Sequence, residues 1–254
     1  MQENYDWHLY IAMLKKGAED MNNILKADEL INLTCPKGGF EFDENGMLLL
    51  TKGNFDIIRD SYFKDQDLNS TYLEIKAYKE KTDYTKADYE KIIKSIADKN
   101  HTHTPEKAIQ DIAKLAVGKN LLESIKNGKT SIVDEMVEEM TIRKERSLLS
   151  KVCRYLETWI FEKEKLDSKD FTFTINDSIL RTVLPYYLYK YVDEQYKKMK
   201  DDITYEEYLS SCKILSEKCE IKNLHELDYL LWYFYSKDSI RLEIIKHIYQ
   251  EGNL

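Results

Sequence analysis

The stretch RSLLSKVCRYLETWIFEKEKLDSKDFTFTINDS, from Arg146 to Ser178, decides how the rest of the chain is interpreted. Within 148–160, apolar residues recur at the spacing of one helix face, which predicts a helix packed against a core. The residues on this face are Leu148, Leu149, Val152, Tyr155, Leu156, Trp159 and Ile160. Lys151 falls just outside the apolar stripe, so we expect its side chain at the edge of the core.

The second half of the stretch changes from a charged run to an alternating pattern. Phe171, Phe173 and Ile175 alternate with threonines, which predicts a short extended segment. Asp177 then stands where a helix begins, and its carboxylate suits the N-cap position. On position alone, Lys151 is also explained as a lysine whose methylenes cover apolar surface while its ammonium reaches water.

Three short motifs resemble landmarks of a known family. They are RSLLSK at 146–151, TINDS at 174–178 and NLHELDYLLW at 223–232. Together they resemble bacterial proteins with the 8-oxoguanine DNA glycosylase fold, part of the helix-hairpin-helix glycosylase superfamily. The lysine of the first motif and the aspartate of the second are that family's catalytic pair, and they match Lys151 and Asp177. The third motif matches Asp228 and Trp232, and the resemblance assigns them no role.

The resemblance implies an enzyme that flips a damaged or modified base out of DNA and excises it. Lys151 would attack the sugar and form a Schiff base, giving glycosylase and AP-lyase activity, and Asp177 would stabilise the cationic sugar. We expect Tyr155 and Trp232 to stack on the base, although both also suit an ordinary core position. Arg146 and Arg181 are the expected phosphate contacts, and DNA is the expected partner.

Two features differ from the family pattern and keep an alternative open. No Gly-rich hairpin precedes Lys151, and the charged run at 163–170 lengthens the interval before Asp177. The formal net charge of -8 also argues against indiscriminate nucleic-acid binding. The alternative is a non-catalytic helical module that binds nucleic acid or a protein partner. A third interpretation is an all-α interaction protein that binds no nucleic acid.

Composition predicts a mainly α protein with two regions. Only 8 Gly and 3 Pro in 254 residues leave little room for the turns of an all-β fold. Residues 1–100 are expected to form a small α+β region of unknown role, with a helix at 7–23 and a short hairpin at 40–50. A Thr-Pro sequence at 104–105 opens a helix, so residues 101–254 are expected to form the helical glycosylase-like domain.

Other patterns limit the location and chemistry of the protein. No apolar run approaches a membrane span, and the first residues lack the apolar core of a signal peptide, so we expect a cytoplasmic protein with no membrane partner. The four cysteines are scattered and expected to be reduced thiols. His101 and His103 have no further ligand nearby, so no metal site and no cofactor are expected.

Overall fold

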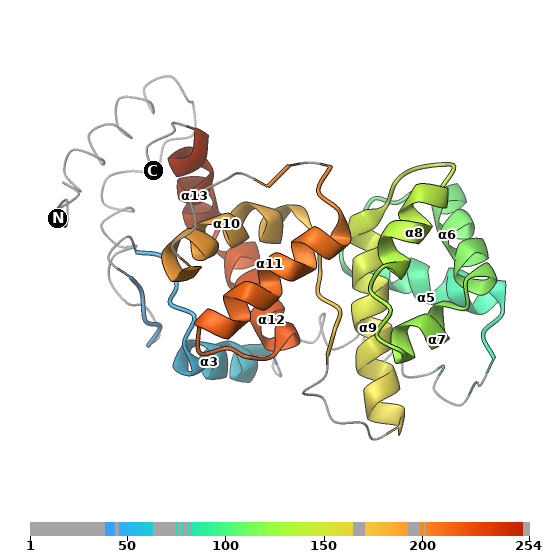
Figure 1. Ribbon diagram of the computed structural model, residues 1–254, viewed down its shortest axis with the longest axis horizontal. Coiled ribbons are helices and arrows are strands. Elements are labelled where there is room, and N and C mark those ends of the chain that lie inside the picture. Colours follow the sequence, from blue (N-terminus) through green and yellow to red (C-terminus); the bar gives the residue numbers. More distant parts are fainter. Residues whose placement is uncertain are drawn as a thin grey trace. The chain divides into compact units, whose positions relative to one another are not determined.

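The protein is mainly helical in the computed structural model (Figure 1). The structure describes residues 39–43, 46–62, 75, 78, 81, 83–164, 171–192, 199–200 and 202–250. The chain separates into two compact units, Met1–Leu49 and Leu50–Leu254. The boundary expected near residue 101 lies inside the second unit, and the helix expected at 7–23 lies outside the described residues.

In the first unit, one antiparallel bridge joins Phe42 to Leu48, at the position of the predicted hairpin. The amide of Asp43 donates to the Met47 carbonyl, and the amide of Leu49 donates to the Glu41 carbonyl, at 2.8 and 3.0 Å. Gly46 has a φ of +70°, which glycine adopts without the strain that a Cβ would bring. The described residues of this unit form a turn with a single bridge rather than regular strands.

The described helices of the second unit are α3 (Lys52–Tyr62), α5 (Lys86–Lys99), α6 (Glu106–Gly118), α7 (Leu121–Lys126), α8 (Ile132–Glu139), α9 (Arg146–Glu164), α10 (Ser178–Val192), α11 (Tyr205–Lys218), α12 (Leu224–Lys237) and α13 (Ser239–Gln250). None of them combines the length and apolar character needed to cross a membrane. The helix that opens after the Thr-Pro sequence begins one residue later than predicted, because Pro105 itself occupies the N-cap position.

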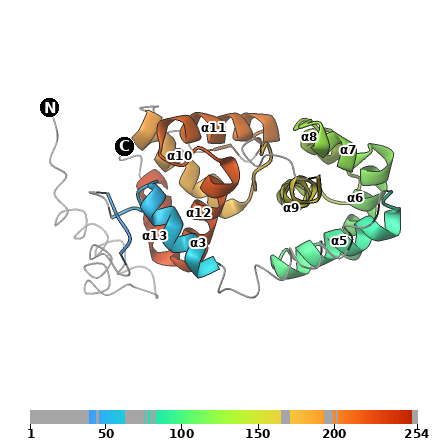
Figure 2. The same cartoon turned by 90° about the horizontal axis from the view of Figure 1, so that it is seen from below.

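Helices α5, α7 and α8 pack against α9, and α6 packs against these three helices (Figures 1 and 2). Helices α5 and α6 contact each other along apolar faces that contain Ile92, Ile96, Ile109 and Ile112. All four side chains are buried, so this group is held by ordinary hydrophobic packing.

Helix α9 confirms the helix predicted at 148–160 and extends it to Glu164. Every residue of the predicted apolar stripe is buried. Lys151 and Glu157 are buried on the same helix, with 4% and 1% of their surface exposed. Lys151 therefore does not reach water at the edge of the core, contrary to the interpretation that its position alone favoured.

Helices α10 to α13 form a second group together with α3. Helix α10 continues through Pro185, although proline removes one backbone donor from a helix. Residues 183–188 are all buried, and the helix packs against α11, α12 and α13, which offsets the lost hydrogen bond. Thr204 and Glu207 form a reciprocal capping box at the start of α11.

Candidate functional site

The segment 171–177 connects α9 to α10 and is held by side chains instead of a β ladder. It lies between the helices in an irregular conformation, and residues 173–177 are buried. Each backbone N–H from Thr172 to Asn176 donates to a side chain: Thr172 and Phe173 to Glu157, Thr174 to the Tyr205 hydroxyl, Ile175 to Asp228, and Asn176 to the Ser150 hydroxyl. The segment's position is thus fixed by α9, α11 and α12.

This segment delivers Asp177 to Lys151. The Oδ1 atom of Asp177 accepts the Leu180 amide at 3.0 Å, which confirms the predicted N-cap of α10. Its Oδ2 atom lies 3.4 Å from the Nζ atom of Lys151. The two side chains are 5% and 9% exposed. An amine and a carboxylate from different elements are therefore held together away from water.

Asp228, on α12, lies beside this pair. Its Oδ2 atom accepts the Ile175 amide at 3.3 Å and is 3.6 Å from the Nε atom of Arg154. Burial raises the pKa of Asp228 to about 7, Arg154 opposes the shift, and the charge of Asp177 adds to it. Asp228 therefore changes its charge near neutral pH, next to Lys151 and Asp177.

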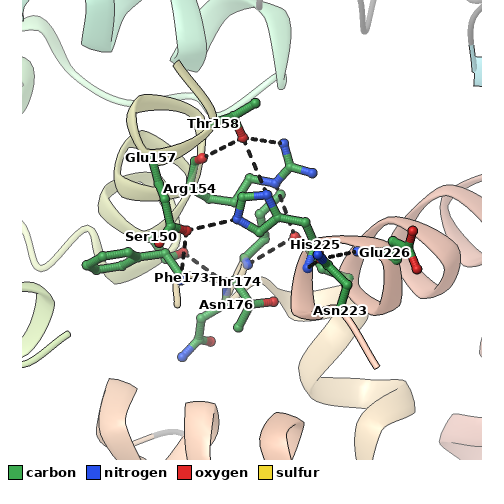
Figure 3. Close-up of polar contacts among 12 residues, drawn as sticks. Ser150, Arg154, Glu157, Thr158, Phe173, Thr174, Asn176, Asn223, His225 and Glu226 are labelled. Atoms are coloured by element: carbon green, nitrogen blue, oxygen red, sulfur yellow. Dashed lines mark hydrogen bonds and ion pairs between the residues drawn. The ribbon is translucent and has the colours of Figure 1, made fainter. Parts of the chain in front are cut away.

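Glu157 and His225 form a second buried polar pair at the N-terminal end of the segment. The Nε2 atom of His225 lies 2.9 Å from Glu157 Oε2, and Figure 3 shows the two side chains facing each other from α9 and α12. The His225 ring also stacks on Phe171, with ring centroids 3.7 Å apart. Burial and the charge of Arg154 lower the pKa of His225 to about 4. Neutral His225 thus donates to the Glu157 carboxylate at physiological pH.

The other predicted site residues have separate environments. Tyr155 is buried one turn after Lys151, and the guanidinium carbon of Arg154 lies 5.5 Å from the centroid of its ring. Trp232 is half-buried on α12, one turn after Asp228. Arg146 is directed towards α8, where its Nε atom lies 3.3 Å from Asp134.

Arg181 lies in the first turn of α10, and its backbone amide donates to the Asp177 carbonyl. Its Nε atom is buried, and it donates to no acceptor among the residues that the structure describes. Lys151 and Asp177 are thus the predicted residues that the structure brings into contact with each other.

Five residues of the site received no role from the sequence: Ser150, Glu157, Asp228, His225 and Tyr205. A signal for two of them was present, because Ser150, Arg154 and Glu157 recur at helical spacing and form a polar row beside the apolar stripe of α9. A buried row of this kind must find polar partners. Tyr205 carried no such signal, since its neighbours in sequence form an ordinary capping box.

In the described parts of the chain, the cysteines and acidic residues form no second candidate site, either a reactive thiol or a metal centre. Cys153, Cys212 and Cys219 are free and buried, and burial raises the pKa of the Cys212 thiol to about 12. Cys35 lies outside the described residues. Within those residues, no three His, Cys, Asp or Glu side chains are grouped to hold a metal ion.

Comparisons with known proteins found no relative: no protein-family model matches the chain, and no match was found among curated proteins or solved structures.

Proposed function

We propose that this protein is a DNA glycosylase with AP-lyase chemistry, which flips out and excises a damaged or modified base. The observation that carries the proposal is the 3.4 Å approach of Lys151 Nζ to Asp177 Oδ2 in a buried setting. These two residues are the ones that the sequence motifs match to the family's catalytic lysine and aspartate. The proposal extends to the fold, with 101–254 as the glycosylase-like helical domain.

In the proposed reaction, the neutral amine of Lys151 attacks C1′ of the flipped nucleotide. The bond between C1′ and the base breaks, and the base leaves with the bonding electrons and takes up a proton. The amine then loses a proton, the C1′–O4′ bond opens, and O4′ is protonated, which leaves a Schiff base between C1′ and Lys151. Asp177 stabilises the positive charge that develops on the sugar, through the Oδ2 atom that faces Lys151.

Four further predicted residues would have roles in this proposal. Tyr155 and Trp232 lie one turn from Lys151 and Asp228 on their helices, where a base could stack on them. The loop before α9 exposes Arg143 and Lys144, and with Arg146 and Arg181 these basic residues would contact phosphates. Arg146 would exchange its ion pair with Asp134 for a phosphate.

Borohydride trapping tests the proposal. The purified protein is incubated with duplex oligonucleotides that each carry one modified base or one abasic site, and sodium borohydride reduces any Schiff base to a stable adduct. We expect the wild-type protein to form the adduct and Lys151→Gln to form none. Asp177→Asn retains an acceptor for the Leu180 amide but loses the charge, so its rate should fall about 100-fold.

A matched control separates Lys151 from general lysine reactivity. Lys91 is exposed on α5, and Lys91→Gln should trap as well as the wild type. Equal trapping by wild type and Lys151→Gln, with circular dichroism showing both folded, would reject the assignment.

A second candidate function is a non-catalytic module that binds nucleic acid or protein on the same scaffold. It is favoured by the net charge of -8 and by arginines that already have acidic partners, Arg143 with Glu145 and Arg146 with Asp134. Such a module would bind DNA with a steep dependence on salt and release no base. Absence of DNA binding at low salt would instead indicate a protein-interaction role.

A further inference from the structure

Asp228 is tied to the backbone that carries Asp177. Its Oδ2 atom accepts the Ile175 amide, and the Tyr208 hydroxyl donates to the Ile175 carbonyl at 2.6 Å. Ile175 is thereby held at both its backbone N–H and its backbone C=O, two residues before Asp177. Because Asp177 also caps α10, a shift of Ile175 would move both the cap and the carboxylate that faces Lys151.

Asp228 is also buried among charged and titratable groups from three other elements. Arg154 and Lys151 face it from α9, Asp177 faces it from the start of α10, and Tyr208 and Cys212 face it from α11. Its second oxygen, Oδ1, is buried and accepts no hydrogen bond from the residues that the structure describes. A carboxylate this deeply buried is costly to keep, and Arg154 and the Ile175 amide offset only part of that cost.

We propose that Asp228 is a positioning residue for the Lys151–Asp177 pair, which fixes the segment carrying Asp177 and places a negative charge between that pair and Arg154. Its catalytic consequence rests on the proposed glycosylase function, whereas its structural consequence does not. The carboxylate form is the better acceptor for the Ile175 amide, because hydrogen bonds to a charged acceptor are stronger. Protonation weakens this anchor, and the change occurs near neutral pH since burial raises the pKa of Asp228 to about 7.

The structural consequence is tested by a pH titration of the free protein, followed by amide NMR. The Ile175 amide reports on Asp228, and the Leu180 amide reports on Asp177, because each donates to that carboxylate. We expect both amide signals of the wild type to shift with one midpoint near pH 7, and both shifts to vanish in Asp228→Asn. A shift of Ile175 without Leu180 would mean that Asp228 titrates but does not position Asp177, and a flat Ile175 signal would overturn the inference entirely.

A matched control is Asp238→Asn. Asp238 also accepts a backbone amide and pairs with an arginine, Arg241, but at the start of α13. This variant should keep both wild-type titrations. Loss of them in Asp238→Asn would show that the readout responds to any weakened helix cap.

The catalytic consequence is tested with an abasic-site duplex and borohydride. The ratio of the wild-type to the Asp228→Asn trapping rate should fall about tenfold between pH 8 and pH 6, since other pH effects cancel in the ratio. A constant ratio would overturn the catalytic part. If the wild type forms no adduct at any pH, the glycosylase proposal fails, and the NMR titration still decides whether Asp228 positions Asp177.

Discussion

Two buried regions of the protein differ in the side chains that fill them. The interface between helices α5 and α6 is filled by aliphatic side chains. The junction, by which we mean the segment 171–177 and the side chains of α9 and α12 that contact it, contains charged ones. Ile92, Ile96, Ile109 and Ile112 fill the first. The junction contains Lys151, Glu157, Asp177, His225 and Asp228, all with less than a tenth of their surface exposed. Hydrophobic packing stabilises a fold at low cost, whereas burying this many ionisable groups costs free energy unless each is paired. The two regions are therefore expected to respond differently to substitution and to pH.

The largest effect on stability is expected from Glu157→Ala. Glu157 accepts the amides of Thr172 and Phe173, the Thr172 hydroxyl and the His225 ring N–H, so its removal takes this acceptor from four donors. At about 1–3 kcal/mol for each buried donor, we expect a loss of about 4 kcal/mol in the free energy of unfolding, measured by urea denaturation. Glu162→Ala on the exposed side of the same helix should change it by less than about 0.5 kcal/mol. Similar losses in both variants would show that the hydrogen bonds of Glu157 do not stabilise the fold more than an exposed glutamate does.

Ile112→Ala probes the apolar region in the same way. Ile112 is fully buried, so the lost transfer energy and the cavity should cost about 3 kcal/mol. Val117 lies on the same helix and is 45% exposed, so Val117→Ala should have little effect. Below its unfolding transition, Ile112→Ala should trap DNA like the wild type, whereas folded Glu157→Ala should trap poorly. Loss of trapping in Ile112→Ala alone would contradict the separation of the two regions.

The pH dependence of stability should also distinguish the junction. Folding raises the pKa of Asp228 from 3.8 to about 7, so the folded protein binds this proton more tightly than the unfolded chain. The resulting stabilisation is fully present below pH 3.8 and is lost as the pH rises through 7. Folding lowers the pKa of His225 from 6.5 to about 4, so the folded protein favours the neutral ring. The resulting stabilisation is fully present above pH 6.5 and is lost as the pH falls through 4. In the wild type, Asp228 therefore makes the free energy of unfolding fall with rising pH, and His225 makes it rise.

Replacing one of the two residues should therefore change the pH dependence of the free energy of unfolding, in opposite directions for Asp228 and His225. From pH 4 to pH 8, Asp228→Asn should gain up to about 3 kcal/mol relative to the wild type, and His225→Gln should lose a similar amount. Thermal unfolding at intervals of one pH unit measures both. Parallel profiles for all three proteins would contradict the assigned charge states.

The smallest effect is expected at the helix caps. Thr204 and Thr85 each form a capping box, one at α11 and one at α5. Thr204→Ala and Thr85→Ala should each cost about 1 kcal/mol, because the same orphan amides are exposed in both regions. A much larger loss for Thr204→Ala than for Thr85→Ala would show that the start of α11 also belongs to the junction.

Local patterns predicted the helices and the N-cap at Asp177. The contact of Lys151 with Asp177 was expected only from the family resemblance, and the other long-range partners of the segment 171–177 were not predicted. The apolar stripe of α9 and the N-cap at Asp177 follow from residues within a few positions of each other. Glu157 and His225 meet only in the folded chain, and their separation gives no periodic signal. Lys151 shows the same limit, since helical spacing placed it at the edge of the core, whereas Asp177 draws it inside.

The most direct measurement is to identify the residue that forms the Schiff base. Wild-type protein is trapped with borohydride on an abasic-site duplex, digested with a protease and analysed by mass spectrometry. The account predicts one modified peptide, with the sugar attached to the Nζ atom of Lys151. Attachment to another lysine or to the N-terminal amine, with Lys151 unmodified, would contradict it.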